Sequence, residues 1–134
     1  LEPIPTRGDT ALAVADAIAR AAYELAEAAH IQRIVVFTLT GNAAKRVAKY
    51  RPSAPIIAVT SDETTSRRLN IVWGITSIVV PLEHDPDVMF RKTGKQLIEL
   101  GLAEKDEYTL IVGSLPMMRV AGKTNLLHIR RLGS

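Results

Sequence analysis

Four short apolar runs rich in β-branched residues, each separated from the next by a segment with helix signals, constrain this chain most. The runs are RIVVF, PIIAVT, SIVVPL and YTLIVG, at residues 33–37, 55–60, 77–82 and 108–113. Runs of this length without polar alternation are typical of strands buried on both faces. Because strands alternating with helices of about 10–15 residues form parallel sheets covered on both faces, the sequence predicts an α/β fold, a three-layer αβα sandwich.

Helix start and stop signals fill the spaces between these runs. Residues 1–8 carry two prolines and one glycine and predict an extended lead-in. Asp9 or Thr10 would then cap an alanine-rich helix that ends near His30. Three further helices are predicted over 42–50, 63–73 and 86–100, the second capped by Asp62, the third opened by Asp85 and stopped by Gly101.

The run LLHIRRL at 126–132 predicts a fifth strand of opposite direction. The connection before it is short and contains proline and glycine, so it cannot form a helical crossover. We therefore expect a five-stranded, mostly parallel sheet whose last strand is an antiparallel edge strand. The 134 residues show no linker and predict one domain over 1–134.

Composition narrows the class of protein. The chain has no cysteine, which excludes disulfides and thiolate metal sites and fits a cytoplasmic protein. No apolar run reaches the roughly 18 residues of a membrane span, so we expect no membrane partner. The chain begins at Leu1 rather than Met, which fits a mature product or a piece of a longer chain.

Charge is unevenly distributed along the chain. Residues 28–61 and 108–134 contain no Asp or Glu, although the net charge is a modest +3. The cations in these two segments are Arg33, Lys45, Arg46, Lys49, Arg51, Arg119, Lys123, Arg130 and Arg131. The two segments could converge on an anion, or their side chains could simply solvate two surfaces.

The turn after the first apolar run, TLTGN at 38–42, is the main candidate site. It follows the carboxyl end of a strand, where ligands bind in open α/β sheets, and it opens a helix, which offers unpaired N–H groups. Gly41 allows close approach, while Thr38, Thr40 and Asn42 add donors. The pattern predicts a phosphate cradle. Its alternative is ordinary turn and N-cap chemistry without a ligand.

A second group of small donors follows the fourth run. Gly122, Lys123, Thr124 and Asn125 lie in the loop after it, which we expect at the same edge of the sheet. Elsewhere the residues lack a catalytic constellation: the three histidines have no metal-ligand spacing, and Ser114 lacks the GxSxG context. The residues alone therefore predict no catalytic residue and no metal site, and indicate a binding and assembly domain.

Several segments together resemble the C-terminal domain of pyruvate kinase. That family has a strand, Thr-x-Ser/Thr-Gly, a helix ending in Tyr-Arg-Pro-x-Ala-Pro-Ile, then Ala-Val-Thr and a Thr-x-x-x-Arg-x-Leu helix. A Trp/Arg-Gly turn follows, and Gly-x-Thr-Asn precedes the last strand. The matching positions here are Thr38–Gly41, Tyr50–Ile56, Ala58–Thr60, Thr65–Leu69, Trp73–Gly74 and Gly122–Asn125. The resemblance extends over nearly the whole chain.

This resemblance implies a function beyond what the residues alone indicate. Pyruvate kinase transfers phosphoryl from phosphoenolpyruvate to ADP with Mg2+ and often K+, in a catalytic barrel that is absent from this chain. Its C-terminal domain builds a subunit interface of a homotetramer and holds an allosteric site. Carried over, the effector phosphate would be bound by Thr38, Leu39, Thr40, Gly41, Asn42 and Ala43, with a wall at Arg119, Gly122, Lys123 and Thr124.

The sequence departs from the family members that bind fructose bisphosphate. Those tend to carry Arg and then Ser after the loop glycine, where this chain has Asn42 and Ala43. A Trp-Arg pair after the fourth strand is also missing, since residues 115–118 read LPMM. The resemblance therefore implies a phosphomonoester effector, a hexose or pentose phosphate or AMP, or the loss of effector binding.

Two other functions stay open at this point. One is a freestanding small protein or enzyme that binds phosphorylated ligands on the same fold. The other is a nucleic-acid binder, which a pI near 9.5 would permit. The chain has 4% aromatic residues and no RNA-binding signature, so we expect no nucleic-acid partner.

Overall fold

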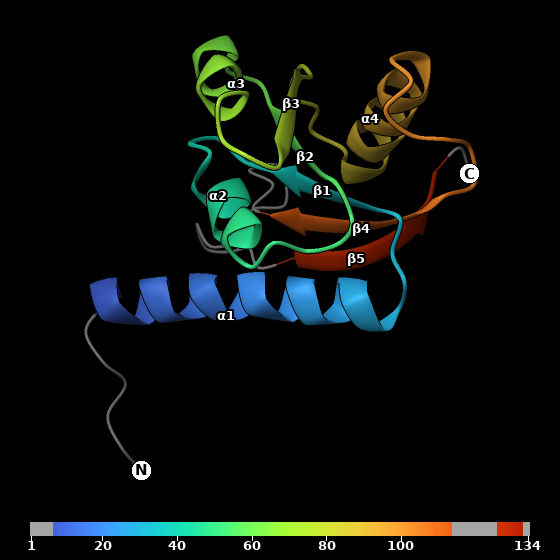
Figure 1. The fold of residues 1–134 in the computed structure, drawn as a ribbon. Helices are drawn as coiled ribbons and strands as arrows, with labels where there is room; N and C mark the ends of the chain where they lie inside the picture. Colours follow the sequence, from blue (N-terminus) through green and yellow to red (C-terminus); the bar gives the residue numbers. More distant parts are fainter. Residues whose placement is uncertain (1–6, 114–125, 133–134) are drawn as a thin grey trace.

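The structure is a computed structural model that describes residues 7–113 and 126–132 (Figure 1). Its elements in order are α1 (Arg7–Ala28), β1 (Arg33–Phe37), α2 (Asn42–Lys49), β2 (Ile56–Thr60), α3 (Glu63–Leu69), β3 (Ile75–Val79), α4 (Pro86–Glu99), β4 (Tyr108–Gly113) and β5 (Leu126–Arg131).

Five strands of the described residues form one sheet in the order β3-β2-β1-β4-β5. Strand β1 pairs in parallel with β2 and β4, and β2 pairs in parallel with β3. Strand β5 pairs antiparallel with β4 at the edge. Figure 1 shows the β1 and β4 arrows pointing to one side and the β5 arrow pointing to the other. The predicted mostly parallel sheet with an antiparallel last strand is confirmed.

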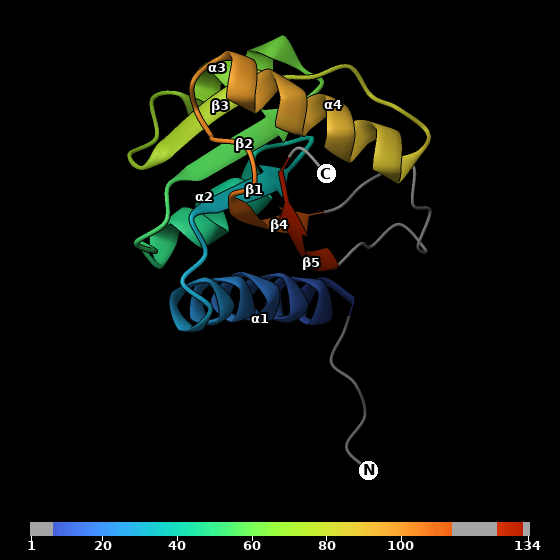
Figure 2. The ribbon, with the colours of Figure 1, turned by 90° about the vertical axis from the view of Figure 1, so that its right-hand side faces the viewer.

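Helices cover both faces of the sheet, which confirms the predicted three layers. Ile34 and Val36 of β1 pack in one cluster with buried residues of α1, α2 and α3. Val35 and Phe37 point to the other face and pack in a second cluster with residues of α4. Figure 2 shows α1 and α4 on opposite sides of the sheet. The alternation of side chains along a strand divides the core in this way.

Alanine lets α1 lie close to its face of the sheet. Ala19, Ala22 and Ala26 are buried at helical spacing. Their short side chains favour helix and allow close packing against larger residues of the sheet. The side chain of Tyr50, just after α2, stacks on Tyr23 of α1 and donates its hydroxyl to Asp16 at 3.0 Å. The alanine face and the Tyr50 contacts together fix α1 against α2.

Three predicted elements have wrong bounds: helix α1, helix α3 and strand β3, which was predicted over 77–82 and spans Ile75–Val79. Helix α1 begins at Arg7, so Asp9 and Thr10 lie inside it, and the extended lead-in does not reach residue 8. No residue from 6 to 10 is a proline, and a single glycine in a helix is tolerated. The third helix, predicted over 63–73, ends at Leu69.

Helix α3 ends before its predicted end because the side chain of Asn70 hydrogen-bonds to the next strand, β3. Asn70 is the C-cap residue of α3, and its carboxamide oxygen accepts from the backbone N–H of Ser77 at 2.8 Å. Strand β3 begins at Ile75, where it pairs with Ile56 of β2. The exposed Thr76 breaks the apolar run, which is why the sequence placed the start of this strand too late.

In the described part of the chain, no helix has both the length and the apolar character needed to span a membrane.

Candidate functional site

The carboxyl ends of β1 and β4 and the amino end of β5 lie together at one edge of the sheet. Phe37 at the end of β1 pairs with Gly113 at the end of β4, and Gly113 pairs with Leu126 at the start of β5. The turn after β1 therefore lies near Gly113 and Leu126, the described residues that flank segment 114–125. The predicted wall residues Arg119, Gly122, Lys123 and Thr124 lie outside the described residues.

Backbone and hydroxyl groups organise the turn between β1 and α2. Thr38 is buried, and its hydroxyl oxygen accepts from the N–H of Gly41 at 2.8 Å. The hydroxyl oxygen of Thr40 accepts from the N–H of Asn42 at 3.3 Å. Gly41 is the N-cap residue, with φ of 92° and no capping side chain. The positive φ favours glycine, and the two threonines take over the capping.

This arrangement leaves hydrogen-bond donors for an anion. Each threonine hydroxyl that accepts an N–H keeps its own proton to donate. The N–H group of Ala43 lies in the first turn of α2, where no carbonyl of the helix can pair with it, whereas Ala44 is fully buried. Thr40 and Asn42 are exposed. The predicted turn residues thus combine free donors with the positive end of a helix, although part of the donor set already caps the turn.

Helix α3 holds this turn in place through residues that the sequence reasoning did not assign to the site. The Thr65 hydroxyl lies 3.0 Å from the carbonyl oxygen of Leu39 and 2.8 Å from Oδ2 of Asp62, and its single proton serves one acceptor at a time. A Cβ at Gly41 would lie 2.9 Å from Cδ2 of Leu69. Thr65 and Leu69 are four residues apart and so lie on one face of a helix. This spacing was the signal in the sequence that both could contact the same turn.

The acid nearest this framework is held in its charged form. Asp62 is the N-cap residue of α3 and accepts from the N–H of Thr64 at 3.2 Å. Hydrogen bonds from the Thr65 hydroxyl and the Thr64 backbone hold the pKa of Asp62 below its ordinary value. Asp62 therefore caps α3 as a carboxylate and leaves the Thr65 hydroxyl shared with the turn.

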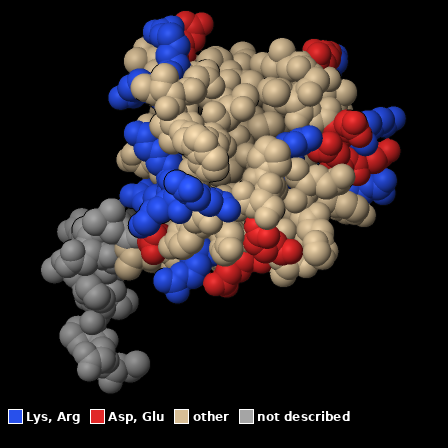
Figure 3. All heavy atoms as spheres, viewed as in Figure 1, with Lys and Arg blue, Asp and Glu red and all other residues tan. Residues whose placement is uncertain are grey.

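Cations gather on the α2 and α3 side of the molecule. Lys45, Arg46, Arg67 and Arg68 belong to these two short helices. Figure 3 shows blue side chains over α2 and α3, on the side where the turn after β1 lies. Nη2 of Arg68 lies 3.5 Å from the Thr65 hydroxyl, so this cation is close to the framework of the turn. A group of cations of this kind creates a positive electrostatic potential, which attracts anions.

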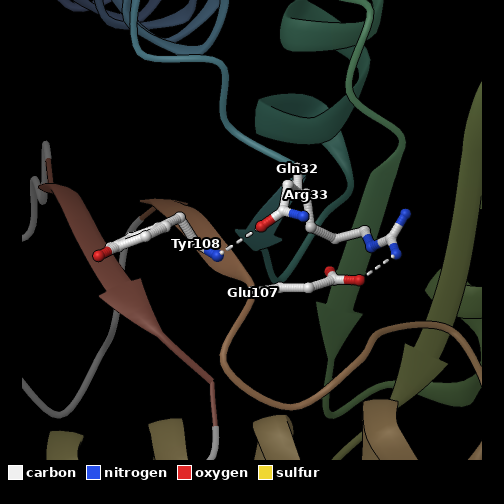
Figure 4. Close-up of polar contacts among 4 residues, drawn as sticks. All are labelled: Gln32, Arg33, Glu107 and Tyr108. Atoms are coloured by element: carbon white, nitrogen blue, oxygen red, sulfur yellow. Dashed lines mark hydrogen bonds and ion pairs between the residues drawn. The ribbon is translucent and has the colours of Figure 1, made fainter.

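Other cations of the two acid-free segments do not reach the turn. Arg33 begins β1 at the opposite edge and pairs with Glu107 (Figure 4). Arg130 and Arg131 pair in the sheet with Thr109 and Tyr108 near that same opposite edge. Because β5 runs antiparallel, Arg130 and Arg131 lie away from the carboxyl ends of the parallel strands. The two acid-free segments, 28–61 and 108–134, can therefore converge on an anion at the turn through a part of their cations at most.

Other residues noted in the sequence make packing contacts in the structure. The His128 ring stacks on Phe90 with centroids 6.0 Å apart, a packing role. Trp73 is 74% exposed and lies under the Arg51 guanidinium at 4.9 Å, outside both core clusters. Among residues 7–113 and 126–132, no three His, Asp or Glu side chains gather as metal ligands would.

Comparison with known proteins gives consistent matches. Residues 16–130 match the family model described as pyruvate kinase, alpha/beta domain. The chain is 34% identical over 117 residues to the pyruvate kinase of Agrobacterium vitis, covering 87% of this chain and 24% of that protein. It is 34% identical over 128 residues to that of Methylorubrum extorquens, covering 96% of this chain and 25% of that protein.

Solved structures agree with these matches. A pyruvate kinase from Cryptosporidium parvum superposes with a TM-score of 0.75 at 30% identity, over 97% of this chain and 24% of that one. The same organism's enzyme in complex with ADP gives 0.78 at 30% identity, over 98% and 25%. The chain spans about a quarter of the length of the relatives it matches.

Proposed function

The chain belongs to the pyruvate kinase alpha/beta domain family, and on this premise we propose that it is the regulatory and oligomerisation domain of a pyruvate kinase. Phosphoryl transfer from phosphoenolpyruvate to ADP would take place in a catalytic barrel outside this chain, in the cytoplasm. Mg2+ and K+ would serve that barrel. The isolated domain would not catalyse the reaction.

A phosphorylated metabolite would bind at the turn between β1 and α2. The observation that carries this proposal is the set of donors at 38–43, at the strand ends where Gly113 and Leu126 flank the segment that contains Lys123. The Thr40 hydroxyl, the Asn42 amide and the N–H group of Ala43 suit the oxygens of one phosphate. Lys123 would add a cation from the neighbouring loop.

The charge at this turn favours a phosphomonoester over a bisphosphate. Asn42 and Ala43 follow the glycine, so these two positions supply neither a guanidinium nor a hydroxyl. Nη2 of Arg68 lies 3.5 Å from the Thr65 hydroxyl, which contacts the turn at Leu39. One phosphate group matches these donors, and a hexose phosphate, a pentose phosphate or AMP would supply it.

Regulation would follow from differential affinity. A ligand shifts a tetramer between two states to the extent that it binds one state more tightly. The turn is tied to α3 through Thr65 and Leu69, so a phosphate bound there would favour one relative position of α2 and α3. Subunit contacts made by the domain would then transmit that preference to the barrel.

A thermal-shift experiment on the full-length enzyme tests this site. AMP, glucose 6-phosphate and ribose 5-phosphate are added one at a time, and one of them should raise the melting temperature. A ligand at 100 times its Kd stabilises the protein that binds it by about 2.7 kcal/mol. The double variant Thr40→Ala/Lys123→Ala should lose the shift, because it removes a hydroxyl donor and a cation from the site.

The matched control removes the same residue types elsewhere. Thr64→Ala/Lys105→Ala changes an exposed threonine of α3 and an exposed lysine of the loop before β4, and it should keep the full shift. A shift that survives in Thr40→Ala/Lys123→Ala would remove the proposed site. Cross-linking of the enzyme with and without residues 1–134 tests oligomerisation, since loss of the domain should abolish the tetramer.

A further inference from the structure

Helix α4 and strand β5 enclose a groove on the sheet face that α1 and α2 do not cover. Its volume is about 510 Å³, within the range of about 300–1,000 Å³ typical of small-molecule sites. Apolar surface comes from Phe90, Ile98 and Leu132, and cationic side chains from Arg91, Lys95 and Arg130. The groove shares no lining residue with the turn between β1 and α2.

Two buried hydroxyls without partners belong to residues that line a void next to this groove. Thr93 of α4 is 3% exposed and Thr109 of β4 is fully buried, and neither hydroxyl has a hydrogen-bond partner among the described residues. Both residues line a void of about 10 Å³ that shares Phe90, Arg130 and Leu132 with the groove. A void of this size holds one water-sized atom, and buried hydroxyls normally have a partner.

Glycine keeps the groove open. Gly94 lies in the interior of α4, where glycine destabilises a helix relative to alanine. A Cβ at this position would lie 3.3 Å from Cδ2 of Leu132, on the wall shared by the groove and the void. Any longer side chain would therefore extend into the space between α4 and Leu132.

The charges give the groove a direction. Arg130 lines both the groove and the void. Its ion pair with Asp87, at 3.7 Å, involves a carboxylate that is 78% exposed and so largely screened by solvent. Glu99 lines the groove near the carboxyl end of α4, one residue after Ile98. An anion would be repelled from the Glu99 end and attracted to the Arg130 end.

We propose that this groove binds a small amphipathic carboxylate. One carboxylate oxygen occupies the void and accepts hydrogen bonds from the hydroxyls of Thr93 and Thr109, while Arg130 balances the charge. The apolar body lies along Phe90, Ile98 and Leu132, and Arg91 and Lys95 raise the local concentration of anions. This site is separate from the phosphate site proposed above and does not depend on it.

Calorimetric titration of the full-length protein with octanoate tests the proposal, with 1-octanol as a neutral probe of the same chain length. We expect saturable binding of octanoate and at least about tenfold weaker binding of 1-octanol, because hydrogen bonds to a charged group contribute most of the selectivity. Thr93→Val/Thr109→Val keeps the side-chain shapes and should weaken octanoate binding by about tenfold or more.

Two further variants complete the design. Gly94→Met fills the groove with a good helix former and should abolish octanoate binding, so the proposal stays testable if the threonine variant does not fold. Lys105→Gln removes a lysine that does not line the groove and should bind octanoate like the parent protein. Absence of saturable octanoate binding, equal binding of 1-octanol, or undiminished binding in Gly94→Met would each overturn the proposal.

Discussion

Nη2 of Arg33 lies 3.0 Å from Oε1 of Glu107, an ion pair that joins the amino ends of β1 and β4 (Figure 4). Both side chains are largely buried, at 19% and 8% exposed. Beside this pair, the Gln32 side-chain oxygen accepts from the N–H of Tyr108 at 3.0 Å. These contacts fix the edge of the sheet opposite the candidate phosphate site, and so hold the two strands whose other ends carry the loops.

Neutralising one member of this pair should destabilise the domain strongly. Glu107→Gln leaves the Arg33 guanidinium buried without a counter-charge, and we expect a loss of about 3 kcal/mol in the free energy of unfolding. Asp106→Asn is the matched control, since its pair with Arg131 is about half exposed on both sides; it should lose less than about 1 kcal/mol. Equal losses in urea denaturation would contradict the burial argument.

Gly41 should tolerate alanine less well than Gly74. Both have positive φ, 92° and 83°, so each substitution pays about 1–2 kcal/mol of backbone strain. A Cβ at Gly41 also meets Cδ2 of Leu69 at 2.9 Å, whereas one at Gly74 meets no described atom within 4 Å. Gly41→Ala should therefore lower the free energy of unfolding by about 1 kcal/mol more than Gly74→Ala does. Thermal and urea denaturation of the two variants measure this difference.

The Asp62 carboxylate predicts a specific pH dependence. Its folded-state pKa lies below the ordinary value because Thr65 and Thr64 donate to it. Its contribution to stability is therefore fully present above the unfolded-state pKa and is lost as the pH falls through the folded-state pKa. Thr65→Val removes the largest cause, so NMR titration should show the Asp62 pKa rising toward its ordinary value. Thr64→Val keeps the backbone donor and should leave the Asp62 pKa low.

Removing an unpaired hydroxyl should have the opposite effect from removing a paired one. Thr109→Val replaces a buried hydroxyl that has no partner among the described residues, and we expect the free energy of unfolding to rise by about 1 kcal/mol. Ser77→Ala removes a hydroxyl that donates to Ser66 at 2.7 Å, so the free energy of unfolding of this variant should fall by about 1 kcal/mol. If the free energy of unfolding of Thr109→Val decreases instead, a water in the void pairs with the Thr109 hydroxyl.

Helix caps and strand runs show how far local signals reach. Asp62 and Asp85 cap α3 and α4 as the sequence predicted, and YTLIVG forms β4 with the predicted bounds. These features depend on neighbours in sequence: a carboxylate accepts an N–H two residues on, and a run of apolar residues needs burial. The end of α3 was mispredicted because it depends on Asn70 pairing with Ser77, a contact made across the following turn.

The sequence by itself determined the order of strands and helices, the antiparallel edge and the turn at 38–42, because each follows from hydrophobic periodicity or from the backbone preferences of glycine, proline and capping residues. Only the tertiary structure decided which cations reach which edge, that Thr65 and Leu69 frame the turn, and that Thr93 and Thr109 share a void. Those are contacts between residues distant in the chain, and sheet register and helix packing fix them.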